Sequence, residues 1–254
     1  MKFVFDLDGT ICFKGQPISE GIVQCLEQLI EEGHEVIFAS ARPIRDMLPV
    51  VDERFHNYIL IGGNGSLVSK EGKVVHINSF MVEQVGLIME LIREHEATYL
   101  IDSDWDYAYT GAMDHPILNN VDSMKLANRV TVESLRNIVK ILILSATNME
   151  ELAEKLVELD VVVHKHKDEN VLDISPRNIH KWSALQTIGV EEKQFIAFGN
   201  DANDISMFKE ALHSVRIGDH PELGEYATES ISLGTDLERS IIDTIGELSE
   251  RRFI

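Results

Sequence analysis

The sequence predicts an α/β protein built on a doubly wound parallel sheet, with a second α/β domain inserted into the first. Apolar runs of strand length alternate with amphipathic helical segments near both ends of the chain, which is typical of a parallel sheet covered by helices. This rhythm changes in the middle of the chain, and 254 residues are enough for a core domain and a smaller inserted one.

The first sixty residues carry a β-α-β pattern. The apolar run at Lys2–Phe5 predicts a buried strand. Ser19 caps a predicted helix, and a second strand is predicted at Glu35–Ala39. A further helix after Pro43 and a strand at Tyr58–Ile61 continue the alternation.

The pattern differs between about residues 66 and 176. Two short apolar runs on either side of residues 70–73 predict a β-hairpin over residues 66–77. Helices and strands are then interleaved without the earlier order, which indicates a second α/β domain. The predicted elements are the helices Met81–His95 and Asn148–Leu159 and the strands Thr98–Ile101, Lys140–Leu144 and Val161–His164.

The first rhythm returns after Pro176. The predicted elements are a helix near Ile179–Ile188, a strand at Gln194–Phe198, a helix starting near Asn203, a short strand at Val215–Ile217 and a closing amphipathic helix at Leu237–Leu248. We therefore expect residues 1–79 and 177–254 to form one discontinuous core domain, and residues 80–176 to form the inserted domain.

The chain is strongly acidic. Asp and Glu outnumber Lys and Arg by 43 to 23, and the net charge of -20 argues against binding to a nucleic acid or to an anionic membrane. Cys12 and Cys25 are too few for a disulfide framework, and the first residues lack the apolar run of a signal peptide. These features predict a cytoplasmic location and leave the oligomeric state open.

Asp6 and Asp8 follow the first predicted strand at a spacing of two, so both side chains point to the same side if the strand continues. Two convergent carboxylates can hold a hard cation, while one attacks phosphorus and the other handles the proton of the leaving group. Gly9 allows a sharp turn, and Thr10 offers a hydroxyl and a backbone N–H to a phosphate oxygen. The structural alternative is a pair of solvated carboxylates in a turn.

Asp6-Leu7-Asp8-Gly9-Thr10 resembles the first motif of the haloacid dehalogenase superfamily, Asp-x-Asp-x-Thr. The resemblance implies a Rossmann-like core, with Asp6 as the nucleophile and Asp8 as the general acid and base. Phe38-Ala39-Ser40-Ala41-Arg42 is similar to the second motif, which implies that Ser40 hydrogen-bonds the phosphoryl group, supported by Arg42. Without the family, Ser40 would be interpreted as an ordinary helix cap before Pro43.

Lys181 and residues 199–204 resemble the third and fourth motifs of the superfamily. Lys181 is implied to neutralise the nucleophile and the phosphate, although many relatives carry Gly where this chain has Trp182. Taken alone, a lysine near a helix start is usually a solvated surface residue.

Residues 199–204 read Gly-Asn-Asp-Ala-Asn-Asp, against Gly-Asp-x-x-Asn-Asp in the superfamily. Asn200 thus stands where the usual magnesium-binding Asp would be. Its oxygen, with Asp201 as the alternative, is the candidate Mg²⁺ ligand beside Asp6 and Asp8. Asn203 and Asp204 are expected to support this loop or to cap the following helix.

The four motifs occur in family order, which implies a magnesium-dependent phosphatase acting through a phosphorylated Asp6. The long insert, preceded by Gly63-Asn64-Gly65-Ser66, is similar to the α/β cap of the Cof-type, class IIB branch, which acts on small phosphorylated metabolites and especially on sugar phosphates. The expected partner is therefore a small phosphomonoester, and Mg²⁺ would offset its repulsion by the acidic protein.

Two alternatives remain open at this point. Similar cores and caps also occur in phosphosugar mutases, which return the phosphoryl group to the sugar. The neutral Asn200 suggests a sugar-phosphate-binding sensor that has lost catalysis. Release of inorganic phosphate separates the phosphatase from the mutase, and tight binding without turnover would identify the sensor.

Two polar clusters in the insert are less informative. His164, Lys165, His166 and Lys167 fit an alternating strand that faces solvent, but they would meet the substrate's phosphate or hydroxyls if the insert covers the site. The second cluster, Asp102, Asp104, Trp105 and Asp106, is interpreted mainly as a loop.

Overall fold

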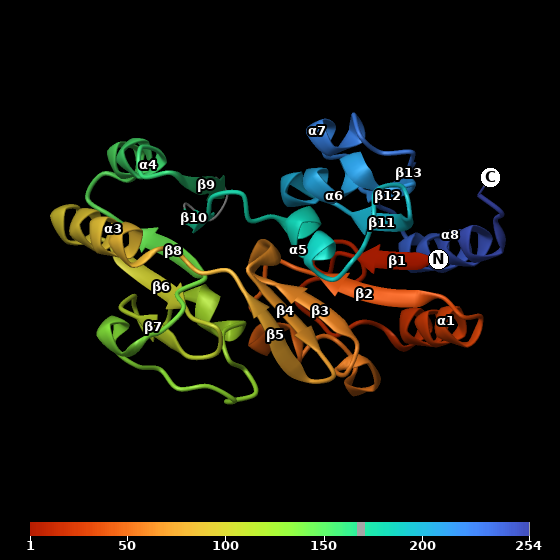
Figure 1. The fold of residues 1–254 in the computed structure, drawn as a ribbon, viewed down its shortest axis with the longest axis horizontal. Helices are drawn as coiled ribbons and strands as arrows, with labels where there is room; N and C mark the ends of the chain where they lie inside the picture. Colours follow the sequence, from red (N-terminus) through yellow and green to blue (C-terminus); the bar gives the residue numbers. More distant parts are fainter. Residues whose placement is uncertain (167–170, 254) are drawn as a thin grey trace.

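The computed structural model describes residues 1–166 and 171–253 and contains two sheets, which lie in separate lobes (Figure 1). The larger sheet has eight strands in the order β13-β12-β11-β1-β2-β3-β4-β5. Their bounds are β1 Lys2–Phe5, β2 Glu35–Ala39, β3 Ile59–Gly62, β4 Leu67–Lys70, β5 Lys73–Ile77, β11 Phe195–Gly199, β12 His213–Ile217 and β13 Glu229–Ile231. The strands from β13 to β3 are parallel, which confirms the predicted core.

The smaller sheet has five strands in the order β7-β6-β8-β10-β9, all antiparallel to their neighbours. Their bounds are β6 Thr98–Asp102, β7 Tyr107–Tyr109, β8 Lys140–Ser145, β9 Val161–His166 and β10 Val171–Pro176. Helices α3 (Val82–Glu94) and α4 (Met149–Val157) pack on one face of this sheet. All these elements lie within residues 80–176, and we propose that this stretch is a cap domain, as the sequence predicts.

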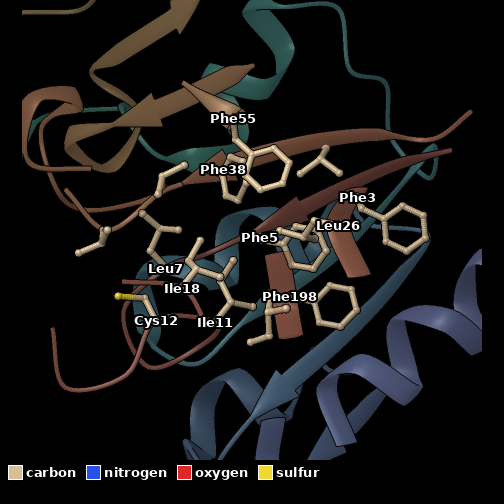
Figure 2. Packing of buried hydrophobic residues seen from close by; sticks show 14 of the residues in the cluster. Phe3, Phe5, Leu7, Ile11, Cys12, Ile18, Leu26, Phe38, Phe55 and Phe198 are labelled. Atoms are coloured by element: carbon tan, nitrogen blue, oxygen red, sulfur yellow. The ribbon is translucent and has the colours of Figure 1, made fainter. Parts of the chain in front are cut away.

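Helices cover both faces of the larger sheet. The side chains of β1 point alternately to one face and to the other, and on both faces they are buried under helices. Phe3 and Phe5 belong to a core that includes Leu26 of α1 and Ile241 of α8, and Figure 2 shows part of this cluster. Val4 points into a second core, with side chains of α5 and α6. The helices of this domain are α1 Glu20–Glu31, α2 Ile44–Met47, α5 Lys181–Thr187, α6 Ile205–Glu210, α7 Pro221–Gly224 and α8 Leu237–Glu250.

The register of the three central strands brings their carboxyl ends to one level. Phe5 at the end of β1 lies opposite Phe38 of β2 and Phe198 of β11. The residues that follow these strands therefore meet at one edge of the sheet, where parallel α/β folds bind ligands. This edge faces the cap (Figure 1).

Several elements differ from those predicted. The hairpin at 66–77 is present, but it extends the core sheet as two antiparallel edge strands. The helix after Pro43 is a single turn. The sequence pattern did not indicate β7, β10 or β13, because β7 and β13 have only three residues each and β10 carries a buried Asp173. Lys167 lies outside the described residues, whereas His164–His166 do belong to a strand.

The cap is attached to the core through a buried arginine. Arg45 of α2 is 1% exposed and donates to both carboxylate oxygens of Asp46 at 2.9 and 2.7 Å, to Asp102 Oδ1 at 2.8 Å and to the Trp105 carbonyl at 2.6 Å. Asp102 was expected in a loop. It instead ends strand β6 and is buried, because the guanidinium of Arg45 compensates its charge.

Among the described residues, none of the helices has the length and the apolar character that crossing a bilayer requires.

The first prediction concerns the buried Arg45. Replacing it by Met (Arg45→Met) leaves Asp46 and Asp102 buried without their cation, so the free energy of unfolding should fall by about 3–5 kcal/mol in urea titrations. The matched control is Arg54→Met, because Arg54 also forms several ion pairs but lies at the surface. A shift no larger than that of the control would show that the Arg45 cluster does not stabilise the fold.

Candidate active site

Four segments meet at the carboxyl edge of the larger sheet. They are the loop after β1 with Asp6, the loop after β2 with Ser40, the start of α5 with Lys181, and the loop after β11 with Asn200. These are the four regions in which the sequence predicts functional residues. The structure therefore brings together side chains that lie up to 194 positions apart in the chain, between Asp6 and Asn200.

A buried lysine holds two carboxylates at the centre of this region. Lys181 Nζ donates to Asp6 Oδ1 and to Asp204 Oδ1, both at 2.6 Å. Lys181 and Asp204 are fully buried, and Asp6 is 4% exposed. Burial raises the pKa of Asp6 to about 7, although Lys181 opposes this effect. The pKa of Lys181 is raised by Asp204 and Asp6 despite its own burial, so the lysine stays cationic.

The loop after β1 turns sharply and returns a hydroxyl to Asp6. Gly9 has a φ of +81°, a conformation that glycine adopts readily. Thr10 Oγ1 donates to Asp6 Oδ2 at 2.8 Å, and the N–H of Thr10 donates to the Leu7 carbonyl at 3.1 Å. In this structure both donors of Thr10, which the sequence assigns to a phosphate oxygen, are engaged within the loop.

Three oxygen-bearing groups converge beside Asp6 and fit a cation. The amide of Asn200 lies 3.1 Å from Asp6 Oδ2, 3.0 Å from the Asp8 carbonyl oxygen and 3.2 Å from Thr10 Oγ1. If its nitrogen points there, it donates to these atoms. If the amide oxygen of Asn200 takes this position, it faces two other acceptors, Asp6 Oδ2 and the Asp8 carbonyl oxygen. A bound cation would stabilise these three oxygens together. Carboxylate, carbonyl and amide oxygens are ligands that Mg²⁺ accepts.

This ligand set contains a single carboxylate. Accordingly, no cluster of three or more His, Cys, Asp or Glu side chains suited to a metal occurs in residues 1–166 and 171–253. The fit depends on Gly9, because a Cβ on Gly9 would lie 2.2 Å from Asn200 Nδ2. The turn at Gly9 thus makes room for the amide that replaces the usual aspartate.

Asp8 is not packed against Asp6 but paired with Arg42. Both guanidinium nitrogens Nε and Nη2 of Arg42 donate to the Asp8 carboxylate at 2.6 Å, and the Asp8 side chain is 47% exposed. Ser40 Oγ accepts a bond from the Arg42 N–H at 3.1 Å, so the loop after β2 is ordered around the same pair. Asp8 and Arg42 therefore lie on the open side of the site, whereas Ser40 beneath them is buried.

The remaining predicted residues have different roles in the loop after β11. Asp201 accepts from the Ala202 N–H at 2.7 Å and lies 3.3 Å from His220 Nε2, so its carboxylate is directed to His220. Asp204 accepts from the N–H groups of Asn200 and Asp201 at 2.8 and 3.1 Å. This geometry favours Asn200 over Asp201 as the ligand beside Asp6.

Sequence reasoning missed Asn64. Its Oδ1 accepts from Asn203 Nδ2 at 3.1 Å, and its backbone N–H donates to the Ser40 carbonyl at 3.0 Å. Asn64 has a φ of +57°, between two glycines. One of these, Gly65, would place a Cβ 2.4 Å from the His180 carbonyl oxygen. The Gly-Asn-Gly pattern was an available signal of this close packing.

The chain is similar to known hydrolases and phosphatases in sequence and in fold. Residues 3–233 match the model of the haloacid dehalogenase-like hydrolases. The chain is 20% identical to the 5-amino-6-(5-phospho-D-ribitylamino)uracil phosphatase of Escherichia coli, over 96% of this chain and 94% of that protein. It is 24% identical to the HMP-PP phosphatase of Yersinia enterocolitica, over 84% and 82%. The solved structure of a subclass IIB sugar phosphatase covers 97% of this chain and 98% of its own, with a TM-score of 0.78 and 15% identity.

The role of Gly9 can be tested by adding one methyl group. Gly9→Ala should displace Asn200 and weaken Mg²⁺ binding by about tenfold or more in calorimetric titrations. Gly33→Ala is the matched control, because Gly33 has a similar φ of +86° but a Cβ there meets no atom within 4 Å. Equal effects of the two substitutions would mean that backbone strain, rather than the position of Asn200, is responsible.

The neutral amide at position 200 gives a third prediction. Asn200→Asp adds a charge 3.1 Å from Asp6 Oδ2, so Mg²⁺ should bind at least about tenfold more tightly. In EDTA the same variant should unfold at lower urea, because two carboxylates then face each other. The companion variant Asp201→Asn should change Mg²⁺ affinity less than Asn200→Ala does. The reverse order would make Asp201 the ligand.

Proposed function

The chain belongs to the haloacid dehalogenase-like hydrolases and is a phosphatase of small phosphorylated metabolites, and from this premise we propose that it hydrolyses sugar phosphates with Mg²⁺, through a phosphorylated Asp6. The observation that carries the proposal is the environment of Asp6. One of its oxygens is bound to Lys181, and the other faces Thr10 and the amide of Asn200. A cytoplasmic location belongs to the same proposal.

The first half-reaction forms a bond from an Asp6 oxygen to phosphorus. The bond from phosphorus to the leaving-group oxygen breaks as this happens, and that oxygen takes a proton from Asp8. Lys181 remains bonded to Asp6 and compensates the charge that the phosphoryl group brings into a buried site. Asp204 holds Lys181 from its other side and so fixes the direction of its ammonium group.

The second half-reaction hydrolyses the aspartyl-phosphate. Asp8, now ionised, takes a proton from water, whose oxygen attacks phosphorus. The bond between phosphorus and Asp6 breaks, inorganic phosphate leaves, and Asp6 is again a carboxylate. Mg²⁺, held by Asp6, the Asp8 carbonyl and Asn200, would supply positive charge to the phosphate oxygens throughout.

Arg42 links substrate binding to the release of Asp8. In the structure the Asp8 carboxylate is occupied by two bonds from Arg42. A phosphate ester offers Arg42 an acceptor of higher charge, so its guanidinium exchanges Asp8 for the substrate. Asp8, released from the cation, takes up a proton from solvent and then transfers this proton to the leaving group.

The substrate class rests on the relatives and on the cap. Relatives are named for phosphatases of a ribityl phosphate and of HMP-PP, and one solved neighbour is a sugar phosphatase. The carboxyl ends of the central core strands face the smaller lobe (Figure 1), so we expect side chains of this lobe to contact the leaving group.

The decisive experiment compares the wild type with Asp6→Asn. We expect phosphate release from sugar phosphates and p-nitrophenyl phosphate with Mg²⁺, its loss in EDTA, and a reduction of at least about 10³-fold in Asp6→Asn. The control is Asp243→Asn, which removes a carboxylate from the exposed face of α8.

The two alternatives predict other results. A mutase would interconvert sugar phosphates without releasing phosphate, and a sensor would bind them without turnover. Undiminished phosphate release by Asp6→Asn would exclude Asp6 as the nucleophile.

A further inference from the structure

Lys181 is the first residue of α5, so the start of this helix determines where its side chain leaves the backbone. The ammonium group is fully buried between Asp6 and Asp204. The first N–H groups of an α-helix have no partner within the helix, and the first turn loosens unless other groups bind them. The position of Lys181 therefore depends on the residue that caps α5.

That residue is His180, which caps the helix together with Ser183. Nδ1 of His180 accepts the Ser183 N–H at 3.0 Å, so Nδ1 is the ring nitrogen without a proton. In return, Ser183 Oγ accepts the His180 N–H at 3.0 Å and donates to the His180 carbonyl at 2.7 Å. This reciprocal pair is a capping box, with a histidine at a place that Ser, Thr, Asp or Asn usually occupies.

A neutral imidazole suits this position. Burial lowers the pKa of His180, which favours the uncharged ring that capping through Nδ1 requires. A carboxylate would also cap the helix, but it would add a negative charge one residue before Lys181, where Asp6 and Asp204 already lie and an anionic substrate is expected. The imidazole caps α5 without that charge.

The rest of α5 is anchored independently of the cap. The indole of Trp182 stacks on the ring of Phe195, with centroids 5.6 Å apart and an angle of 12° between the planes. The backbone of His180 packs against the loop after β3, where a Cβ on Gly65 would lie 2.4 Å from the His180 carbonyl oxygen. Loss of the capping side chain should therefore loosen the first turn, which contains Lys181, and leave the fold intact.

Resting on the proposed function, we propose that His180 is a positioning residue for phosphoryl transfer. With Ser183 it holds the first turn of α5 in the geometry that places the Lys181 ammonium between Asp6 and Asp204. It acts through Lys181 rather than on the substrate. Because Lys181 compensates charge during the transfer, a displaced ammonium lowers the rate.

The first measurement is phosphate release from p-nitrophenyl phosphate. His180→Ala should lower kcat and kcat/KM by about fivefold each, the effect expected from the loss of one helix cap. His180→Asn keeps an acceptor that can cap the helix and should restore most of the rate. The matched control is Asn148→Ala, because Asn148 caps α4 by accepting the Glu151 N–H at 3.2 Å and should not affect the rate.

A second variant breaks the same capping box from its other side. Ser183→Ala should also lower kcat. The double variant His180→Ala/Ser183→Ala should lose no more than about twofold beyond His180→Ala, because the two side chains form one unit. Losses that multiply in the double variant would show that the two residues act independently and would overturn the inference.

The second measurement reports on the ammonium group without turnover. In protein with ¹⁵N-labelled lysine, the Lys181 ammonium should give an NMR signal that exchanges slowly with water, because the group is buried and bonded to two carboxylates. Lys181→Arg, which keeps a cation, identifies this signal by its loss. Exchange should be about fivefold faster in His180→Ala, and close to wild type in His180→Asn and Asn148→Ala.

The inference requires both changes in His180→Ala. Slower catalysis without faster exchange would give His180 another role, and faster exchange without slower catalysis would show that the position of Lys181 does not limit the rate. Either result, or a rate that His180→Asn does not restore, would overturn the inference while the proposed function stands. If the wild type hydrolyses no ester but exchange responds as expected, His180 positions Lys181 and the proposed function fails.

Discussion

The site depends on one buried ion cluster, in which Lys181 lies between Asp6 and Asp204. A buried charge is tolerated only when its partners are in place, so each of these residues requires the other two. The cluster also fixes its surroundings. Asp204 binds the backbone of the loop that carries Asn200, and Asp6 binds Thr10. Segments from both ends of the chain are thereby held in one arrangement.

The cap is fixed to this arrangement through the segment that follows β2. Residues 40–46 contain Ser40 and Arg42, which line the site, and Arg45, which binds Asp102 of the cap. Lys140 of the cap binds the carbonyl of Ala41 in the same segment. A movement of the smaller lobe must therefore move or break contacts of the loop that orders Arg42 and Asp8. The proposed substrate selection and the proposed acid-base chemistry thus share one structural element.

The sequence predicts much of the fold because its signals are local. The apolar run at Lys2–Phe5 predicts strand β1, and Ser19 marks the start of helix α1 as its N-terminal capping residue. Neither signal depends on distant residues. Three of the four motifs follow β1, β2 and β11, whose carboxyl ends meet at one edge of the parallel sheet, and the remaining motif residue, Lys181, begins α5. Short strands such as β7 and β13 have too few residues to show a period, and sheet pairing alone places them.

Features that depend on contacts between distant residues could not be predicted from the sequence. Three such contacts join residues that are far apart in the chain: Asp8 and Arg42 are 34 positions apart, Asn203 and Asn64 are 139 apart, and Arg45 and Asp102 are 57 apart. The spacing predicts that the side chains of Asp6 and Asp8 converge. In the structure the chain turns at Gly9 and Asp8 forms an ion pair with Arg42, so the two carboxylates have different surroundings. The choice between Asn200 and Asp201 likewise needed the position of His220.

The order of strands in the core sheet also constrains biosynthesis. Strand β1 is paired on one side with β11, which leaves the ribosome only after the whole cap has been made. Until then the edge of β1 lacks its neighbour β11, Phe5 lacks Phe198, on which it stacks, and Asp6 lacks Lys181. Incomplete nascent chains therefore expose an apolar strand that is prone to aggregation. Chaperones that bind such strands should be needed most while residues 80–176 are being translated.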